Sequence, residues 1–138
     1  MLNSHFVGKA AQKALIIKGR TVLITRDSND EVWELPGGRL DSDENPREGI
    51  LREVREELGV EGKVDGIYDV RTMFHTRYAA DMLVVYYLVS LIDESAQFVV
   101  DKEEVAEMAW VNSESYKSYS FFPEYERVLS EYFDKVPS

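Results

Sequence analysis

The sequence contains no cysteine, which excludes both a disulfide framework and a thiolate metal site. It also has no long apolar segment, because the longest unbroken apolar run, Met82 to Val89, is far too short to span a bilayer. The N-terminus lacks the apolar core and cleavage site of a secretory signal. We therefore expect a soluble, cytoplasmic protein with no membrane partner.

Positive charge is scarce. The chain has 16 lysine and arginine residues against 26 acidic residues, which gives a formal net charge of −10. A nucleic-acid polymer binds to a basic surface, so this composition argues against such a partner. It does not exclude a phosphorylated small molecule, because bound metal ions can invert the potential at one site.

The chain does contain enough apolar sequence for one ordinary domain. Its 138 residues are 44% hydrophobic, so we expect a single domain over residues 1–138 with a substantial core. The run from Met82 to Val89 is apolar on both faces, which is typical of a central strand covered on each side. This pattern predicts an α+β fold with helices on both faces of a sheet.

Turn residues between apolar runs predict the other elements. Lys18-Gly19-Arg20 separates two apolar runs, which indicates a hairpin, and the last helix has an amphipathic pattern. We expect strands at 14–17, 22–24, 32–35, 62–76, 81–92 and 105–111, and a helix at 123–133.

Three glutamates stand close together on one predicted helix. Glu53, Glu56 and Glu57 are spaced i, i+3 and i+4, so their side chains project from one face. Like charges this close raise one another's pKa and oppose folding. A divalent cation with oxygen ligands relieves that repulsion. The spacing therefore predicts a metal site.

The ends of this helix follow from residue chemistry. Asn45 is suited to the N-cap, Pro46 to the first helical position, and Gly59 to the position just past the C-terminus. Gly49 lies among the glutamates on the helical wheel. We expect it to leave the acidic face open to an approaching ion or phosphate.

Two other interpretations of the segment need comparison. Interleaved glutamates and arginines often form a solvated face held by i,i+4 pairs, here Glu48 with Arg52. The acidic and amide residues of 41–45 also alternate as in a calcium-binding EF-hand loop. Pro46 stands where that loop needs a turn glycine, and Arg52 where it needs a bidentate glutamate, so we reject the EF-hand.

The segment from Gly38 to Val60 resembles the complete signature of the Nudix hydrolases. It reads Gly38, five residues, Glu44, seven residues, then Arg52-Glu53-Val54-Arg55-Glu56-Glu57-Leu58-Gly59-Val60. The preceding Trp33-Glu34-Leu35-Pro36-Gly37 also resembles the sequence that leads into this signature. Many members have glycine directly before the first glutamate, where this chain has Asp43. The resemblance covers 23 of 138 residues, with nine constrained positions.

This resemblance implies a Nudix-type α/β/α sandwich with a mixed sheet between helices. It also implies hydrolysis of a diphosphate linkage in a nucleoside diphosphate joined to some group X, with Mg²⁺ or Mn²⁺. The chain shows no serine, cysteine or tyrosine nucleophile motif, which agrees with metal-assisted attack by water.

Roles for individual residues follow from the resemblance. Glu56 and Glu57 would be the principal metal ligands, and Glu53 a ligand or the group that orients or deprotonates water. A backbone carbonyl near Gly38 would join the metal shell. The family's structural pair would be Glu44 and Arg52. A further metal-binding or base carboxylate would come from a later loop, where Glu104 and Glu103 are the candidates; a solvated loop remains the alternative there.

Substrate selectivity in this family lies outside the signature. Phe74, His75, Arg77 and Tyr78 can form a pocket rim that stacks a base or grips a phosphate. A structural role is the more common one for His75 and for Trp33. We expect a phosphorylated nucleotide-type small molecule as partner, and a homodimer is possible because many relatives pair.

Two rival functions stay open at this point. One is a Nudix-like sensor that holds a nucleotide without cleaving it, although such proteins commonly lose glutamates that this chain keeps. The other is an interaction module whose acidic helix binds a basic partner.

Overall fold

A mixed sheet of seven strands forms the middle layer of residues 5–136, the part of the chain that this computed structural model describes. The elements are β1 (Lys9–Lys18), β2 (Thr21–Asp27), β3 (Trp33–Glu34), β4 (Gly37–Arg39), α1 (Pro46–Leu58), β5 (Gly62–His75), β6 (Ala80–Leu91), β7 (Val105–Val111), a 3₁₀ turn (Ser115–Ser118) and α2 (Pro123–Lys135).

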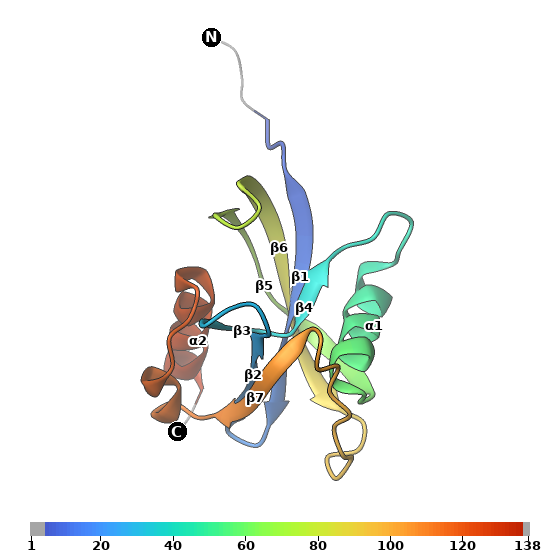
Figure 1. Ribbon diagram of the computed structural model, residues 1–138, viewed down its shortest axis with the longest axis vertical. Helices are drawn as coiled ribbons and strands as arrows, with labels where there is room; N and C mark the ends of the chain where they lie inside the picture. The colour runs from blue at the N-terminus through green and yellow to red at the C-terminus, as the bar shows by residue number, and fades with distance from the viewer. Residues whose placement is uncertain (1–4, 137–138) are drawn as a thin grey trace.

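The two helices cover opposite faces of the sheet (Figure 1). Helix α1 buries Ile50, Val54 and Leu58 in one core cluster, together with apolar residues from β1, β2 and β6. Helix α2 buries Val128 and Leu129 in a second cluster on the other side. The predicted α/β/α sandwich is therefore confirmed, and the helical periods of the sequence explain which side chains face the sheet.

The strand order places β6 inside the sheet, between β1 and β5. It runs parallel to β1 and antiparallel to β5, so the sheet is mixed. The prediction of a central strand at Met82 to Val89 is confirmed, because β6 places residues in the core clusters of both helical layers. The cover is not complete, since Leu83 is 38% exposed.

Strands β1 and β2 separate soon after their hairpin. Their pairing is limited to Ile17 with Val22 and Lys18 with Thr21. Beyond that point the edge of β1 pairs with β4, and the edge of β2 pairs with β3. This divergence opens the sheet between β1 and β2, and the cavity described below lies there.

Helix α1 has the predicted bounds. The side chain of Asn45 accepts hydrogen bonds from the backbone N–H groups of Arg47 and Glu48, and Gly59 ends the helix with φ +68°. After Pro36, Gly37 and Gly38 form part of β4 and pair with Lys13 and Gln12. Within residues 5–136 we find no helix long and apolar enough to cross a membrane.

We predict that Gly37→Ala lowers the free energy of unfolding by more than about 2 kcal/mol, because Gly37 has φ +143° and a Cβ there would lie 2.1 Å from the Gln12 carbonyl oxygen. Gly66→Ala is the control, since no atom lies within 4 Å of its added Cβ and its φ is not positive. Urea unfolding should show a change of no more than about 1 kcal/mol for Gly66→Ala. Equal stabilities for the two variants would contradict the β1–β4 constraint.

Candidate active site

A cavity of about 260 Å³ lies where β1 and β2 diverge, and we call it the acidic cavity. Its lining comprises Lys13, Thr25, Asp27, Glu34, Gly37, Gly38, Glu53, Glu57, Arg77, Tyr78, Glu104 and Val105. Five carboxylates and two cations therefore face one space. The cavity repels a phosphate unless additional positive charge enters with it.

Glu57 occupies the most buried position among the predicted metal ligands. It is only 8% exposed, and the N–H of Gly37 donates to its carboxylate at 3.4 Å. Burial raises the pKa of Glu57 to about 8; Lys13 opposes this shift, whereas Glu53 and Glu34 add to it. The group is thus short of stabilising positive charge in the protein alone.

Glu53 lies against the backbone of Gly38. A Cβ at Gly38 would be 2.9 Å from Glu53 Oε1, so the missing side chain gives the carboxylate its place. Burial raises the pKa of Glu53, Arg52 lowers it, and Glu56 and Glu104 raise it further. Helix α1 and the backbone at Gly38 are thus in contact through the Glu53 carboxylate.

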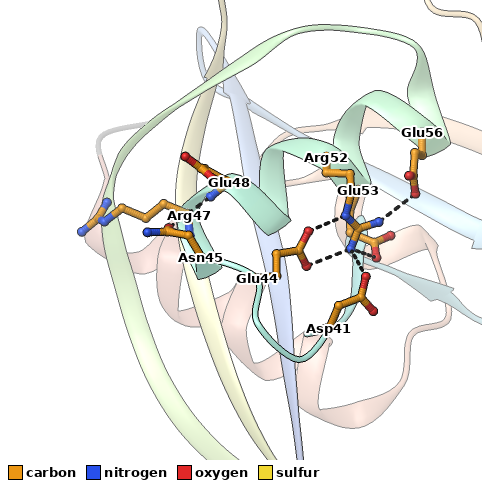
Figure 2. Close-up of polar contacts among 8 residues, drawn as sticks. All are labelled: Asp41, Glu44, Asn45, Arg47, Glu48, Arg52, Glu53 and Glu56. Carbon is orange, nitrogen blue, oxygen red and sulfur yellow. Dashed lines mark hydrogen bonds and ion pairs between the residues drawn. The ribbon is translucent and has the colours of Figure 1, made fainter.

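Arg52 forms a network of ion pairs beside the acidic cavity (Figure 2). It binds both oxygens of Glu44, with Nε to Oε2 at 2.5 Å and Nη2 to Oε1 at 3.0 Å. It also pairs with Asp41 and Glu53, each at 3.2 Å, and with Glu56 at 2.8 Å. The two hydrogen bonds from one guanidinium to one carboxylate join the loop at Glu44 to helix α1.

Two expectations about this helix were wrong. Arg52 forms its i,i+4 pair with Glu56 rather than with Glu48. Gly49 is buried, and a Cβ there would lie 2.6 Å from the side-chain amide of Gln12 and 2.8 Å from Glu44 Oε1. A side chain from β1 therefore fills the space that the sequence suggested was open.

The trio of glutamates is divided in this structure. Glu56 is 56% exposed at its side chain, is bound to Arg52, and does not line the acidic cavity. No group of three acidic, histidine or cysteine side chains in residues 5–136 is close enough to hold a metal ion without rearrangement. Rotation of Glu56 away from Arg52 would be needed for it to join Glu53 and Glu57.

The two candidate loop carboxylates are separated by the structure. Glu104 lines the acidic cavity, as do Glu53 and Glu57 of α1. Glu103 is exposed, and its backbone N–H donates a hydrogen bond to Asp101 Oδ1 at 3.0 Å. Burial, then Asp101, Glu56 and Asp27, raise the pKa of Glu104.

The predicted substrate-binding residues do not all meet. Arg77 and Tyr78 line the acidic cavity, and Arg77 forms an ion pair with Asp30. Phe74 does not line it; this residue is 59% exposed and borders a separate cavity near the start of α2. The alternation of β5 places Phe74 and the buried His75 on opposite faces of the sheet.

The structural roles expected for two aromatic residues agree with their contacts. His75 is 7% exposed, and its Nδ1 accepts a hydrogen bond from the N–H of Arg77 at 3.2 Å. Trp33 packs edge-to-face against Tyr119 with ring centroids 4.9 Å apart.

Asp43 adopts φ +66°, the left-handed conformation that glycine favours, so this position has the backbone conformation of a glycine without being one.

Sequence reasoning missed Lys13 and Glu34. Lys13 is 5% exposed, and its Nζ donates to Glu34 Oε1 at 2.7 Å and to the Leu35 carbonyl at 3.0 Å. Burial alone lowers the pKa of Lys13, but Glu34 and Tyr125 raise it above its ordinary value, so the ammonium stays charged. The signal was a lysine between Ala11 and Leu15 on one face of the strand.

The match to known families agrees with this geometry. The NUDIX domain family model matches residues 9–132. The chain belongs to the Nudix hydrolase family.

Individual relatives support this membership. An RNA pyrophosphohydrolase from Zymomonas mobilis is 26% identical over 124 residues, which cover 77% of this chain and 80% of that protein. A MutT-like protein from Streptomyces ambofaciens is 49% identical over 53 residues, or 36% of this chain, and the match spans only about a third (34%) of that protein. The crystal structure of a MutT protein from Methanosarcina mazei superposes with a TM-score of 0.71, at 28% identity, over 92% of this Nudix chain and 93% of that one.

We predict that Arg52→Ala lowers the free energy of unfolding by about 1–3 kcal/mol, because it leaves Glu44 without its charged partner. Arg55→Ala is the matched control on the same helix, since Arg55 is half-exposed and its nearest ion-pair contact, with Glu61, is 3.6 Å. Thermal and urea unfolding should show little change for that control. A double-mutant cycle of Arg52→Ala with Glu44→Gln measures the coupling directly, and additive effects would contradict the pairing.

Proposed function

We propose that this Nudix protein hydrolyses a diphosphate linkage in a nucleoside diphosphate derivative, using water and Mg²⁺ or Mn²⁺. The supporting observation is the charge of the acidic cavity, where five carboxylates surround one space and the pKa of Glu57 is raised to about 8. Such an arrangement favours the entry of divalent cations, and an anionic pyrophosphate can then follow.

The residues present fit such an ion. Members of this family generally use divalent metal ions. Glu53, Glu57 and the backbone of Gly38 supply hard oxygen donors at the cavity wall, and Glu56 lies one turn away on the exposed side. When bound, a divalent ion would lower the pKa of a coordinated water and neutralise charge on the leaving phosphate.

The remaining roles belong to side chains of this chain. We assign Glu104 as the base that accepts a proton from water, because it faces the two helix carboxylates across the cavity and has a raised pKa. Glu53 is the alternative base. Arg77 and Tyr78, which line the cavity, would orient the substrate, whereas the position of Phe74 makes it the weakest of the proposed substrate contacts.

The names of the relatives agree on the bond that is cleaved, a pyrophosphate, but not on the molecule that carries it. The Zymomonas mobilis protein is named for RNA pyrophosphate hydrolysis, and a shorter match of 49 residues is to a CTP pyrophosphohydrolase of Escherichia coli. Their shared element is the pyrophosphate bond. The retained glutamates disfavour a non-hydrolysing sensor, and the burial of Glu57 disfavours a purely protein-binding acidic face.

Glu57→Gln should keep the fold but reduce kcat at least ~100-fold at saturating Mg²⁺, because it removes one charge from the metal site without changing shape. Glu48→Gln on the same helix is the control, since Glu48 is exposed and outside the acidic cavity. Turnover is measured on a panel of nucleoside triphosphates, nucleotide sugars and dinucleotides with and without metal. Normal turnover of Glu57→Gln would remove this assignment.

Glu104→Gln and Glu103→Gln form a second matched pair. We expect Glu104→Gln to lower kcat by ~10²-fold or more, and the neighbouring variant to change it less than ~3-fold, because only Glu104 faces the cavity. Mg²⁺ titration calorimetry on both variants separates loss of the base from loss of a metal ligand. Equal rates for the two variants would show that this loop supplies no catalytic group.

A further inference from the structure

The acidic cavity continues into a smaller cavity of about 30 Å³ with a different character. Lys13, Glu34, Arg77 and Tyr78 line both spaces, and Tyr125 lines the smaller one. This inner end is polar and aromatic, and it lacks the carboxylates of α1. Its small volume admits only the polar edge of a substrate group other than the pyrophosphate, with the rest of that group in the acidic cavity.

The Lys13–Glu34 pair is the central feature of this inner end. Lys13 is 5% exposed and the side chain of Glu34 is 16% exposed, so the pair is largely removed from water. Buried ion pairs can usually be replaced by apolar residues without loss of stability. The pair therefore has no evident necessity for folding, and its place on a cavity wall points to binding.

Hydrogen-bond capacity shows what the pair can bind. The ammonium of Lys13 has three N–H groups. Within residues 5–136 it donates hydrogen bonds to two oxygens, Glu34 Oε1 and the Leu35 carbonyl, and its Nζ also lies 5.1 Å from the centre of the Tyr125 ring. The second oxygen of Glu34 accepts no hydrogen bond from this part of the chain. One donor and one acceptor thus stand side by side.

Charge decides between the possible ligands. Arg39 and Arg77 also line this space, but Arg39 lies over the ring of Tyr78 and Arg77 pairs with Asp30. The Lys13–Glu34 pair is neutral as a unit, and its carboxylate would repel a phosphate oxygen placed against it. An uncharged group with an acceptor beside a donor satisfies both atoms, and the edge of a nucleobase has this pattern. Tyr78 also lines this space, and its ring lies 5.2 Å from the Arg39 guanidinium and 4.7 Å from the ring of His75.

We propose that Lys13 and Glu34 form a specificity site that recognises the hydrogen-bonding edge of the substrate's nucleobase. The site rests on the proposed function, because it assumes a nucleotide substrate whose pyrophosphate lies near Glu53 and Glu57. Neither residue belongs to the signature of the catalytic helix. The site would make base identity a determinant of the reaction rate.

The test compares kcat/KM for nucleoside triphosphates with four different bases, as ribose and deoxyribose forms, in the full chain with Mg²⁺. The double variant Lys13→Met with Glu34→Leu should lower the ratio of kcat/KM for the preferred base to kcat/KM for the least-favoured base by ~10–200-fold, because an effect on the acidic cavity itself would lower both rates alike. Lys18→Met is the matched control. Lys18 is on the same strand and lies over the ring of Trp110, as Lys13 lies over the ring of Tyr125, but it is outside the cavity.

Glu34→Gln provides a second variant of nearly unchanged shape, in case the double variant does not fold. It converts a pure acceptor into a group that also donates, so the order of base preference should change. Unchanged base preference in folded Glu34→Gln would overturn the proposal. A change confined to the ribose-to-deoxyribose ratio would also overturn it, because the pair would then recognise the sugar.

Binding separates this proposal from the proposed function. Calorimetric titration of the four nucleoside monophosphates, without metal, measures base preference in the absence of turnover. If the wild type cleaves no nucleotide but Glu34→Gln changes the order of affinities, the specificity site stands and the hydrolase proposal falls. If the wild type cleaves nucleotides but no variant alters base preference in either assay, only the specificity site falls.

Discussion

Repulsion among carboxylates is the constraint on which this structure depends. Five of them line one cavity, and three elements supply those nearest the proposed reaction: α1, β3 and the loop before β7. Arg52 relieves the repulsion on the outer side of α1, where it contacts four acidic side chains. Lys13 relieves it on the inner side through Glu34. The pKa of Glu57 stays raised in spite of Lys13. A bound divalent ion would therefore stabilise its ionised form.

Strand β1 organises both sides of the site through two consecutive residues. Gln12 points toward α1, where its amide occupies the space over Gly49. Lys13 points to the other face and holds Glu34 and the Leu35 carbonyl. The backbone of both residues pairs with β4, which places Gly37 and Gly38 beside the helix carboxylates. A single strand thus sets the distance between the glycine turn and α1, because successive side chains point to opposite faces.

Hydrolysis of pyrophosphate bonds is the common theme of related proteins, and the acidic cavity suits such chemistry. What distinguishes one member from another lies in side chains outside the signature. In this chain we propose that these include Lys13, Glu34 and Tyr78, which line the smaller cavity.

Local chemistry explains why much of the molecule was predictable. Asn45, Pro46 and Gly59 mark the ends of α1, because capping and left-handed φ values depend on neighbouring residues alone. Strand and helix periods predicted which faces are buried, and the fixed spacing from Gly38 to Val60 indicated the family. Even Asp43 keeps the backbone conformation for which relatives use glycine.

The sequence by itself thus determined the family, the α/β/α layers and the glutamates of the catalytic helix, since each depends on short-range spacing. Tertiary structure alone decided that Gln12 covers Gly49, that Arg52 turns to Glu56, and that Glu104 rather than Glu103 faces the cavity. It also brought Lys13 to Glu34, 21 residues away. These contacts arise where β1 and β2 diverge. The spacing of neighbouring residues does not predict which distant side chains will contact one another there.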